Sequence, residues 1–231
     1  MARKTSFASS EEPSKSVRIY QDLRRRIREL DLPPGSRLDK NRLALEFGVS
    51  RAPVSEAMAR LADEGLIDVY PQSGTFVSPI RREDIRESLL IRTGLEVEAA
   101  RRVAELADAV LLERLASNLE AEELAVAHGD LRALYELDEA FHAIIFAALR
   151  SSRAHRLLEQ TRAILDRPRF HALPEEGRPR DTVAEHRRIA DAIGTGDPEF
   201  AGSAMRVHLA TVARAIERDF ARAEAARADS E

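Results

Sequence analysis

One predicted β-hairpin constrains the fold of this chain more than any other feature of the sequence. Residues 66–70 and 75–77 flank a turn at Pro71-Gln72-Ser73-Gly74, and together they predict one small β-hairpin. No convincing strand pattern follows it. From about Arg82 onward the apolar residues recur at three- and four-residue spacing, which is typical of helices. We therefore expect a mainly α protein that contains a single hairpin.

Three helices are expected before this hairpin, at residues 16–30, 40–47 and 51–64. Pro33-Pro34-Gly35 ends the first of them and forms a turn. The outer face of this first helix is basic and carries Arg24, Arg25, Arg26 and Arg28. Residues 1–15 are charged and rich in serine, so they are expected to form a flexible tail. The first domain is thus predicted to span residues 16–80.

The rest of the chain, residues 81–228, is predicted to be an all-α antiparallel helical bundle. Its six expected helices are at residues 82–106, 109–127, 130–149, 152–166, 181–194 and 197–226. Asp130, Ser151 and Asp197 are candidate N-caps. Residues 167–180 contain three prolines and are expected to be the one long loop.

The composition narrows the classes of protein to which the chain can belong. It has 231 residues, 33% of them charged and 44% hydrophobic, which is ordinary for a globular protein. No apolar run approaches the roughly 20 residues that cross a bilayer, and the polar N-terminus does not resemble a secretory signal. The absence of cysteine excludes disulfides and thiolate metal sites. We expect a cytoplasmic protein with no membrane partner.

The charges are distributed unevenly between the two predicted domains. Residues 15–60 contain eleven Lys and Arg against six Asp and Glu, whereas the chain from Arg81 onward contains 23 against 29. A basic segment joined to an acidic body indicates that the first part meets a polyanion.

Residues 43–61 have the spacing of a helix-turn-helix. The residues that give this spacing are Ala44 at the helix crossing, Gly48 in the turn, and Val49 and Val54 between the helices. Ser50 is a candidate N-cap, which places Arg51, Ala52 and Ser55 near the start of a helix that could read base edges in the major groove. The hairpin that follows makes this a winged helix-turn-helix. The alternative, a helical hairpin that binds protein, explains neither the basic first helix nor the wing.

Residues 17–80 resemble the GntR family of bacterial transcription factors. The resemblance rests on Pro34-Gly35, Leu38, Leu43-Ala44, Gly48-Val49-Ser50-Arg51, Pro53-Val54, Glu56-Ala57, Leu61, Glu64-Gly65-Leu66 and Gly74. It implies a double-stranded DNA operator as partner. It also implies that Arg51 contacts a base or phosphate, that Gly74 lets the wing approach the minor groove, and that Asn41 or Arg42 reaches the backbone. The full predicted DNA-binding set is Asn41, Arg42, Ser50, Arg51, Ser55, Arg60 and Gly74.

Ser55 departs from the family pattern, which usually has arginine at this position. Serine cannot make the bidentate contact to guanine that arginine makes, a contact that discriminates by roughly 1–3 kcal/mol. We therefore expect an operator preference that differs from the one more common in the family.

Three of the six histidines are predicted to point into the helical bundle. His142, His186 and His208 lie on apolar helix faces, and Asp138 lies one turn before His142. Burying these groups costs several kcal/mol unless they satisfy one another. A shared divalent metal would do so, and separate core histidines bonded to backbone carbonyls are the alternative. The other histidines, His128, His155 and His171, are expected at the surface.

Residues 85–215 resemble the FCD effector domain of the FadR subfamily, in its six-helix, VanR-like branch. The resemblance rests on Arg92-x-x-x-Glu96 with Ala99-Ala100, Asp138-x-x-x-His142, Glu185-His186-x-x-Ile189, Gly196-Asp197 and His208-Leu209. It implies a divalent metal held by Asp138, His142, His186 and His208. Zinc is the expected ion, with nickel, manganese or iron as alternatives.

Four protein ligands on an octahedral metal leave two positions that a small organic acid could chelate. Arg92 would be a second anchor for the acid, or alternatively a surface partner of Glu96. These observations predict a homodimeric, ligand-responsive repressor that binds a palindromic operator.

Two other functions are alternatives to this one. A regulator for which the metal itself is the signal is the first alternative. A metal-dependent hydrolase is the second, and it is disfavoured because no acid or base is aimed at the site. Glu185 is adjacent to His186 in the sequence and therefore points about 100° away from it around the helix, and Glu139 is placed in the same way beside Asp138. We expect no enzymatic activity.

Overall fold

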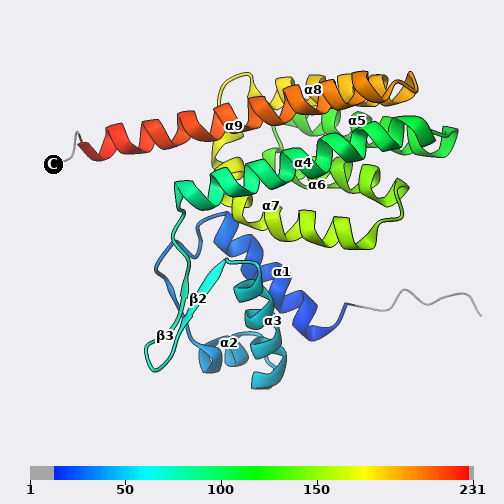
Figure 1. Cartoon of the computed structure of the whole chain (residues 1–231). Coiled ribbons are helices and arrows are strands. Elements are labelled where there is room, and N and C mark those ends of the chain that lie inside the picture. Colours follow the sequence, from blue (N-terminus) through cyan, green and yellow to red (C-terminus); the bar gives the residue numbers. More distant parts are fainter. Residues whose placement is uncertain (1–12, 229–231) are drawn as a thin grey trace, which may run out of the picture. The chain divides into compact units, whose positions relative to one another are not determined.

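The computed structural model describes residues 13–228 and divides into two compact units between Pro79 and Ile80 (Figure 1). The predicted tail, residues 1–15, lies outside the described residues except for its last three. Of those three, Lys15 already belongs to the first helix. Among the described residues no helix is both long and apolar enough to cross a membrane.

The first unit is a winged helix-turn-helix. Its elements are α1 (Lys15–Arg28), β1 (Arg37–Leu38), α2 (Lys40–Glu46), α3 (Arg51–Asp63), β2 (Ile67–Tyr70) and β3 (Gly74–Val77). The sheet is antiparallel, in the order β1-β3-β2, with Arg37 opposite Phe76 and Val69 opposite Thr75. The predicted hairpin is confirmed. Strand β1 was not predicted, because two residues are too few to show an alternating pattern.

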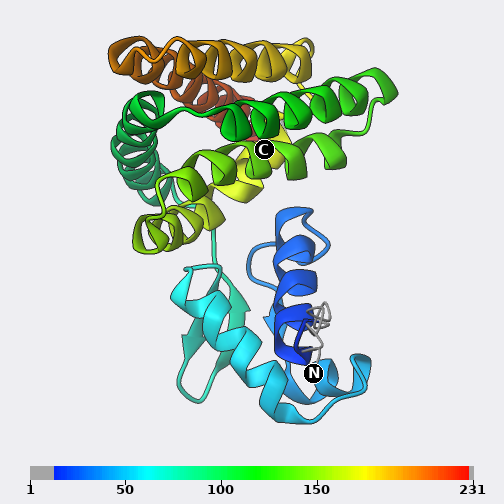
Figure 2. The ribbon, with the colours of Figure 1, turned by 90° about the vertical axis from the view of Figure 1, so that its right-hand side faces the viewer.

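The core of the first unit lies between α1 and α3, which pack together (Figure 2). It is formed by the apolar faces of the two helices, namely Ile19, Leu23 and Ile27 on α1 and Val54, Met58 and Leu61 on α3. Spacing of three and four residues puts these side chains on one face of each helix, and burial of that face holds the two helices together.

The basic face expected on α1 is largely paired with acidic side chains. Arg25 forms ion pairs with Asp22 and Glu29, and Nη1 of Arg26 lies 2.7 Å from Oε1 of Glu46 on α2. Arginines engaged in this way stabilise the unit rather than presenting free charge, so the expectation of a basic outer surface on this helix was too simple.

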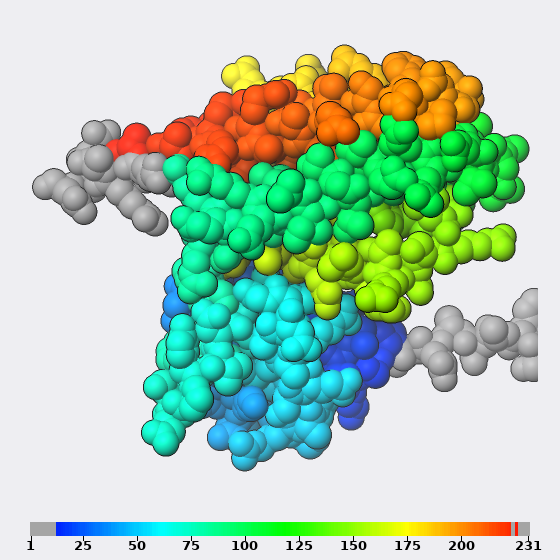
Figure 3. Space-filling view, viewed as in Figure 1, coloured from blue at the N-terminus to red at the C-terminus, as the bar shows by residue number. Residues whose placement is uncertain are grey.

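The second unit consists of helices. Their bounds are α4 (Arg82–Leu106), α5 (Ala109–His128), α6 (Leu131–Ala148), α7 (Ser152–Ala172), α8 (Arg178–Gly194) and α9 (Pro198–Ala228). Helices α4 and α9 pack along each other on one face of this unit (Figure 3). The predicted all-α architecture is confirmed. A helix lies at each of the six predicted places, but the predicted end of the fourth at 166 and the predicted start of the fifth at 181 are wrong.

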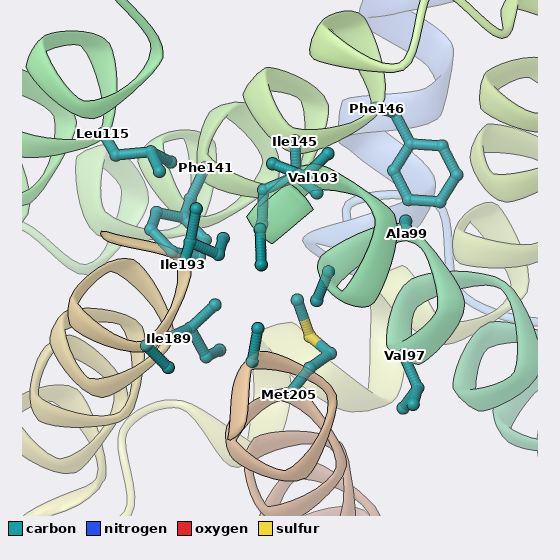
Figure 4. Close-up of a cluster of buried hydrophobic side chains, with 14 of the residues drawn as sticks. Val97, Ala99, Val103, Leu115, Phe141, Ile145, Phe146, Ile189, Ile193 and Met205 are labelled. Carbon is teal, nitrogen blue, oxygen red and sulfur yellow. The ribbon is translucent and has the colours of Figure 1, made fainter. Parts of the chain in front are cut away.

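A large apolar cluster lies in the second unit, in addition to two smaller ones (Figure 4). Val103 of α4, Phe141 and Ile145 of α6, Ile193 of α8 and Met205 of α9 all contribute buried side chains to it, as do residues of α5 and α7. Because helices α4 to α9 all meet in this cluster, its packing sets where the polar residues on the neighbouring turns of the same helices are placed.

Helix capping follows the sequence at some positions and not at others. The carboxylates of Asp130 and Asp197 accept hydrogen bonds from backbone N–H groups in the first turns of α6 and α9, as predicted. Ser50 and Ser151 occupy the N-cap positions of α3 and α7, but neither side chain makes a capping hydrogen bond.

The long loop predicted at residues 167–180 is wrong. Helix α7 continues through Pro168 to Ala172, and α8 begins at Arg178, so only residues 173–177 connect the two helices. Proline in a helix removes one hydrogen bond and usually ends it. Here the flanking residues are held by side-chain contacts, since Tyr135 donates a hydrogen bond to Asp166 and Arg169 contacts Asp138.

Leu115 and Leu124 of α5 provide a test of where the stability of the second unit resides. Leu115 is fully buried in the apolar cluster, whereas Leu124 is 60% exposed. We expect Leu115→Ala to lower the free energy of unfolding by about 2–5 kcal/mol, and Leu124→Ala to change it by less than about 0.5 kcal/mol. Urea unfolding followed by circular dichroism measures both. Equal effects of the two substitutions would contradict this account of the core.

Candidate metal centre and nucleic-acid interface

Three helices bring the four predicted metal ligands together. Asp138 and His142 lie one turn apart on α6, His186 lies on α8 and His208 lies on α9. All four side chains are buried, and one possible ligand atom from each lies within 4.8 Å of the others. Nε2 of His186 is 3.6 Å from Oδ1 of Asp138. A single ion could therefore contact all four residues.

Each of the three histidines uses its Nδ1 atom to contact a buried glutamate. The pairs are His142 with Glu96 on α4, His186 with Glu122 on α5 at 2.9 Å, and His208 with Glu185 on α8 at 2.8 Å. A carboxylate on Nδ1 holds the proton there and leaves Nε2 free to bind a metal. The three glutamates thus orient the three rings.

The Nε2 atoms supply the observation that a metal would explain. Nε2 of His186 and of His208 are buried and make no hydrogen bond with any described residue. Burial lowers the pKa of His142 to about 3 and that of His208 well below its usual range, so both rings are neutral at physiological pH. Neutral imidazole with an open Nε2 is the form that binds zinc and related ions, so the donor set fits a divalent metal.

Three buried arginines surround this ligand set. Nη2 of Arg92 lies 3.2 Å from Nε2 of His142, Nη2 of Arg162 lies 3.0 Å from Oδ2 of Asp138, and Arg169 contacts the same carboxylate oxygen. Burial alone would raise the pKa of Asp138, but Arg169 and the histidines lower it well below its usual range. Asp138 is therefore ionised and is held by two arginines before any metal binds.

Arg92 pairs with Glu96, and its role as an anchor for the acid stays a prediction. Its Nε atom pairs with Glu96, as expected for residues one turn apart, but both side chains are fully buried rather than on the helix surface. Its Nη2 atom faces His142.

The glutamates that contact the histidines were not among the residues predicted from the sequence. Glu185 was expected to point away from the site because it precedes His186, yet it reaches His208 on the neighbouring helix. Glu122 could have been found, because it continues the buried stripe Leu115, Asn118, Leu119 and Ala125 on α5. Both glutamates contact ligand residues, and neither is placed as a catalytic base.

The remaining histidines lie away from the site. His128 and His171 are exposed and His155 is partly exposed, as predicted for surface residues.

The predicted DNA-binding residues lie on the first unit, mostly at its surface. Asn41, Arg42, Ser50 and Arg51 are exposed, and Ser55 is partly buried on the second turn of α3. Gly74 begins β3 with φ +120°, and a Cβ atom there would lie 3.3 Å from Nε of Arg37. Only glycine adopts this backbone conformation without strain, and it lies at the tip of the wing, directly after the turn.

Arg60 contacts other residues of the first unit, whereas the sequence predicted only a DNA contact for it. Its guanidinium lies 3.7 Å from the centre of the Tyr20 ring, and its Nε atom lies 3.3 Å from Oε1 of Glu64. Tyr20 in turn donates a hydrogen bond to Glu64, so these residues tie α3 to α1. A DNA contact by Arg60 stays a prediction.

A winged helix-turn-helix joined to a separate helical unit is typical of bacterial transcription regulators. The comparisons with known proteins place this chain in that class. Residues 15–77 match the bacterial regulatory proteins of the gntR family, and residues 87–211 match the FCD domain.

An uncharacterized HTH-type transcriptional regulator of Streptomyces ambofaciens is 35% identical over 204 residues, which cover 87% of this chain and 84% of that protein. The HTH-type transcriptional repressor RspR of Escherichia coli K12 is 30% identical over 198 residues, covering 86% and 87%. Among solved structures, E. coli McbR/YncC has a TM-score of 0.79 at 22% identity, over 90% of this chain and all of that one.

The chain belongs to the GntR family of transcriptional regulators and carries a C-terminal FCD domain. The members it matches are regulators of transcription and not enzymes, in agreement with the expectation from the sequence.

Glu122 and Glu123 are adjacent on α5 and allow a matched test of the histidine–glutamate contacts. Glu122 is buried against His186, whereas Glu123 is exposed and pairs with Arg187. Loss of a carboxylate behind a ligand histidine typically weakens metal binding 10–100-fold. We expect Glu122→Gln to weaken zinc binding by about this factor and Glu123→Gln to leave it unchanged, measured by competition with a chromogenic chelator. Equal affinity in both variants would show that Glu122 does not support the site.

Proposed function

We propose that this protein is a homodimeric repressor whose first unit binds a palindromic operator and whose second unit binds a small organic acid beside a divalent metal, most simply zinc. The observation that carries the proposal is the pair of buried Nε2 atoms, on His186 and His208, that face Asp138 without a hydrogen bond from any described residue. The relative RspR is itself named a repressor, which supports the sign of the regulation.

The start of α3 supports the proposed DNA contact. A helix N-terminus carries partial positive charge and unpaired N–H groups, which favour a phosphate. The Ser50 side chain does not cap these groups, and the exposed Arg51 follows it. A dimer would present two such helices to the two halves of a palindrome.

Asp138, His142, His186 and His208 would hold the metal. When bound, the ion would supply a Lewis-acidic centre that a carboxylate can chelate. The chain's own contribution is to orient the rings through Glu96, Glu122 and Glu185, and to place Arg92 beside His142, where it can pair with an acid group.

Release of the operator requires that the acid bind the DNA-free arrangement of the protein more tightly than the DNA-bound one. Helix α4 carries Arg92 and Glu96, and the chain joins it to β3 through residues 78–81. The acid would therefore act on the helix that is covalently nearest to the wing.

Metal content gives a direct test of the proposed centre. We expect about one metal ion per chain in protein purified without a histidine tag, and loss of that ion in His186→Ala because one of four ligands is removed. His171→Ala, at an exposed position, should retain it. Elemental analysis measures all three proteins. Absence of metal from the unsubstituted protein, even after incubation with zinc, nickel or manganese, would remove the metal from the proposal and leave the DNA-binding unit unaffected.

Ser55 gives a test of DNA recognition. We expect Ser55→Arg to shift the preferred operator, because arginine can make the bidentate guanine contact that serine cannot, at a gain of roughly 1–3 kcal/mol of discrimination. Selection of binding sites from random duplexes measures the preference. Ser203→Arg, which adds the same charge at an exposed position of α9, is the control. An unchanged operator in Ser55→Arg would contradict a base contact at this position.

A further inference from the structure

A small cavity lies directly beside Asp138, inside the second unit. Its volume is about 30 Å³, and residues of α6, α7, α8 and α9 line it, together with Leu173 just after α7. Its walls are largely apolar, with Leu134, Val212 and Ile216 among them. Its polar groups come from Tyr135, Asp138, Arg169, Arg178 and Thr182, and the Asp138 carboxylate is already paired with Arg162 and Arg169. A space of this size holds one small chemical group.

The cavity is one helical turn away from the metal ligands on each of three helices. Tyr135 precedes Asp138 by three residues, Thr182 precedes His186 by four, and Val212 follows His208 by four. One turn of helix rises about 5 Å, so a ligand chelated at the metal needs to extend by only a few atoms to enter the cavity. Two carbons separated by three bonds in a trans chain lie about 3.8 Å apart, as adjacent Cα atoms do.

Arg169 is the cavity group that has a donor to spare. Its Nη2 atom contacts Asp138, but its Nη1 atom is buried and makes no hydrogen bond with any described residue. The other polar groups that line the cavity are engaged, since Tyr135 donates to Asp166, Thr182 donates to a backbone carbonyl, and Arg178 pairs with Glu185.

A second buried arginine, beside His142, has the same property. Nη1 of Arg92 is fully buried and makes no hydrogen bond with any described residue, while Nη2 faces His142. Arginine keeps its positive charge in proteins. Leaving a buried donor unpaired is costly, and a guanidinium fork matches a carboxylate.

Two buried guanidinium groups, those of Arg92 and Arg169, thus each have an Nη1 atom without a hydrogen-bond partner among the described residues. A guanidinium fork matches one carboxylate, so two such groups favour a ligand that carries two carboxylates.

We propose that the effector is a short dicarboxylate of about four carbons. One carboxylate chelates at the metal beside Arg92, and the second enters the cavity and pairs with Nη1 of Arg169. This inference rests on the proposed function, because it assigns the class of acid that the same site would take.

Two matched acids test it with the metal-loaded, full-length protein. (S)-malate and (S)-2-hydroxybutyrate share a chelating hydroxy acid and differ only in a carboxylate or a methyl group at the far end. A hydrogen bond to a charged group is strong enough that we expect malate to bind at least about tenfold more tightly by isothermal titration calorimetry. In Arg169→Met this preference should disappear, so that the ratio of the two affinities measured in the same variant falls to about one.

A second variant covers the case in which Arg169→Met loses its metal. Ala172 lines the cavity but contacts no proposed metal ligand through an ion pair or hydrogen bond. The substitution Ala172→Leu should therefore fill the space and lower the affinity for malate at least about tenfold. The variant should retain its metal, as measured by elemental analysis. Equal binding of the two acids would contradict the proposal that the effector is a dicarboxylate, but not the proposal that the regulator responds to an acid. If the protein binds metal but neither acid, both of these proposals would be contradicted. A malate preference that survives Arg169→Met and Ala172→Leu would overturn the assignment of the cavity.

Discussion

Three imidazoles and one carboxylate lie inside the second unit, closed off from water, and the arrangement of its helices depends on how these groups are satisfied. Burial of polar groups is unfavourable by several kcal/mol when they lack partners. Each histidine places Nδ1 on a glutamate, and Asp138 accepts from two arginines. Nε2 of His186 and Nε2 of His208 make no hydrogen bond with any described residue.

Every helix of the second unit, as described, contributes to this polar centre. Helix α4 supplies Arg92 and Glu96, α5 supplies Glu122, α7 supplies Arg162 and Arg169, and the ligands themselves come from α6, α8 and α9. The apolar cluster adjoins the centre, and the Phe141 ring stacks on His186 with 4.2 Å between ring centres. A ligand that re-pairs the arginines would therefore act on several helices at once, which is the physical basis that we propose for regulation.

Helix α7 shows how strongly tertiary contacts can override a local signal. Pro168 removes a backbone hydrogen bond, and residues around it read as a loop. In the folded unit, Asp166 and Arg169 on either side of it are buried against Tyr135 and Asp138 of α6. Those contacts keep the helix continuous across Pro168 and place Arg169 beside the proposed metal ligand Asp138.

The sequence by itself determined the two-unit plan and indicated the four residues that the fold brings together as a possible metal site. Helical periodicity put Asp138, His142, His186 and His208 on apolar faces, and the spacing of residues 43–61 indicated the helix-turn-helix. Only the tertiary structure decided which groups meet across helices. Glu122 and His186 are 64 residues apart, and Arg169 reaches Asp138 from 31 residues away. Periodicity reports which face of a helix is buried, but not which side chain of another helix lies opposite it, because that depends on how the helices pack.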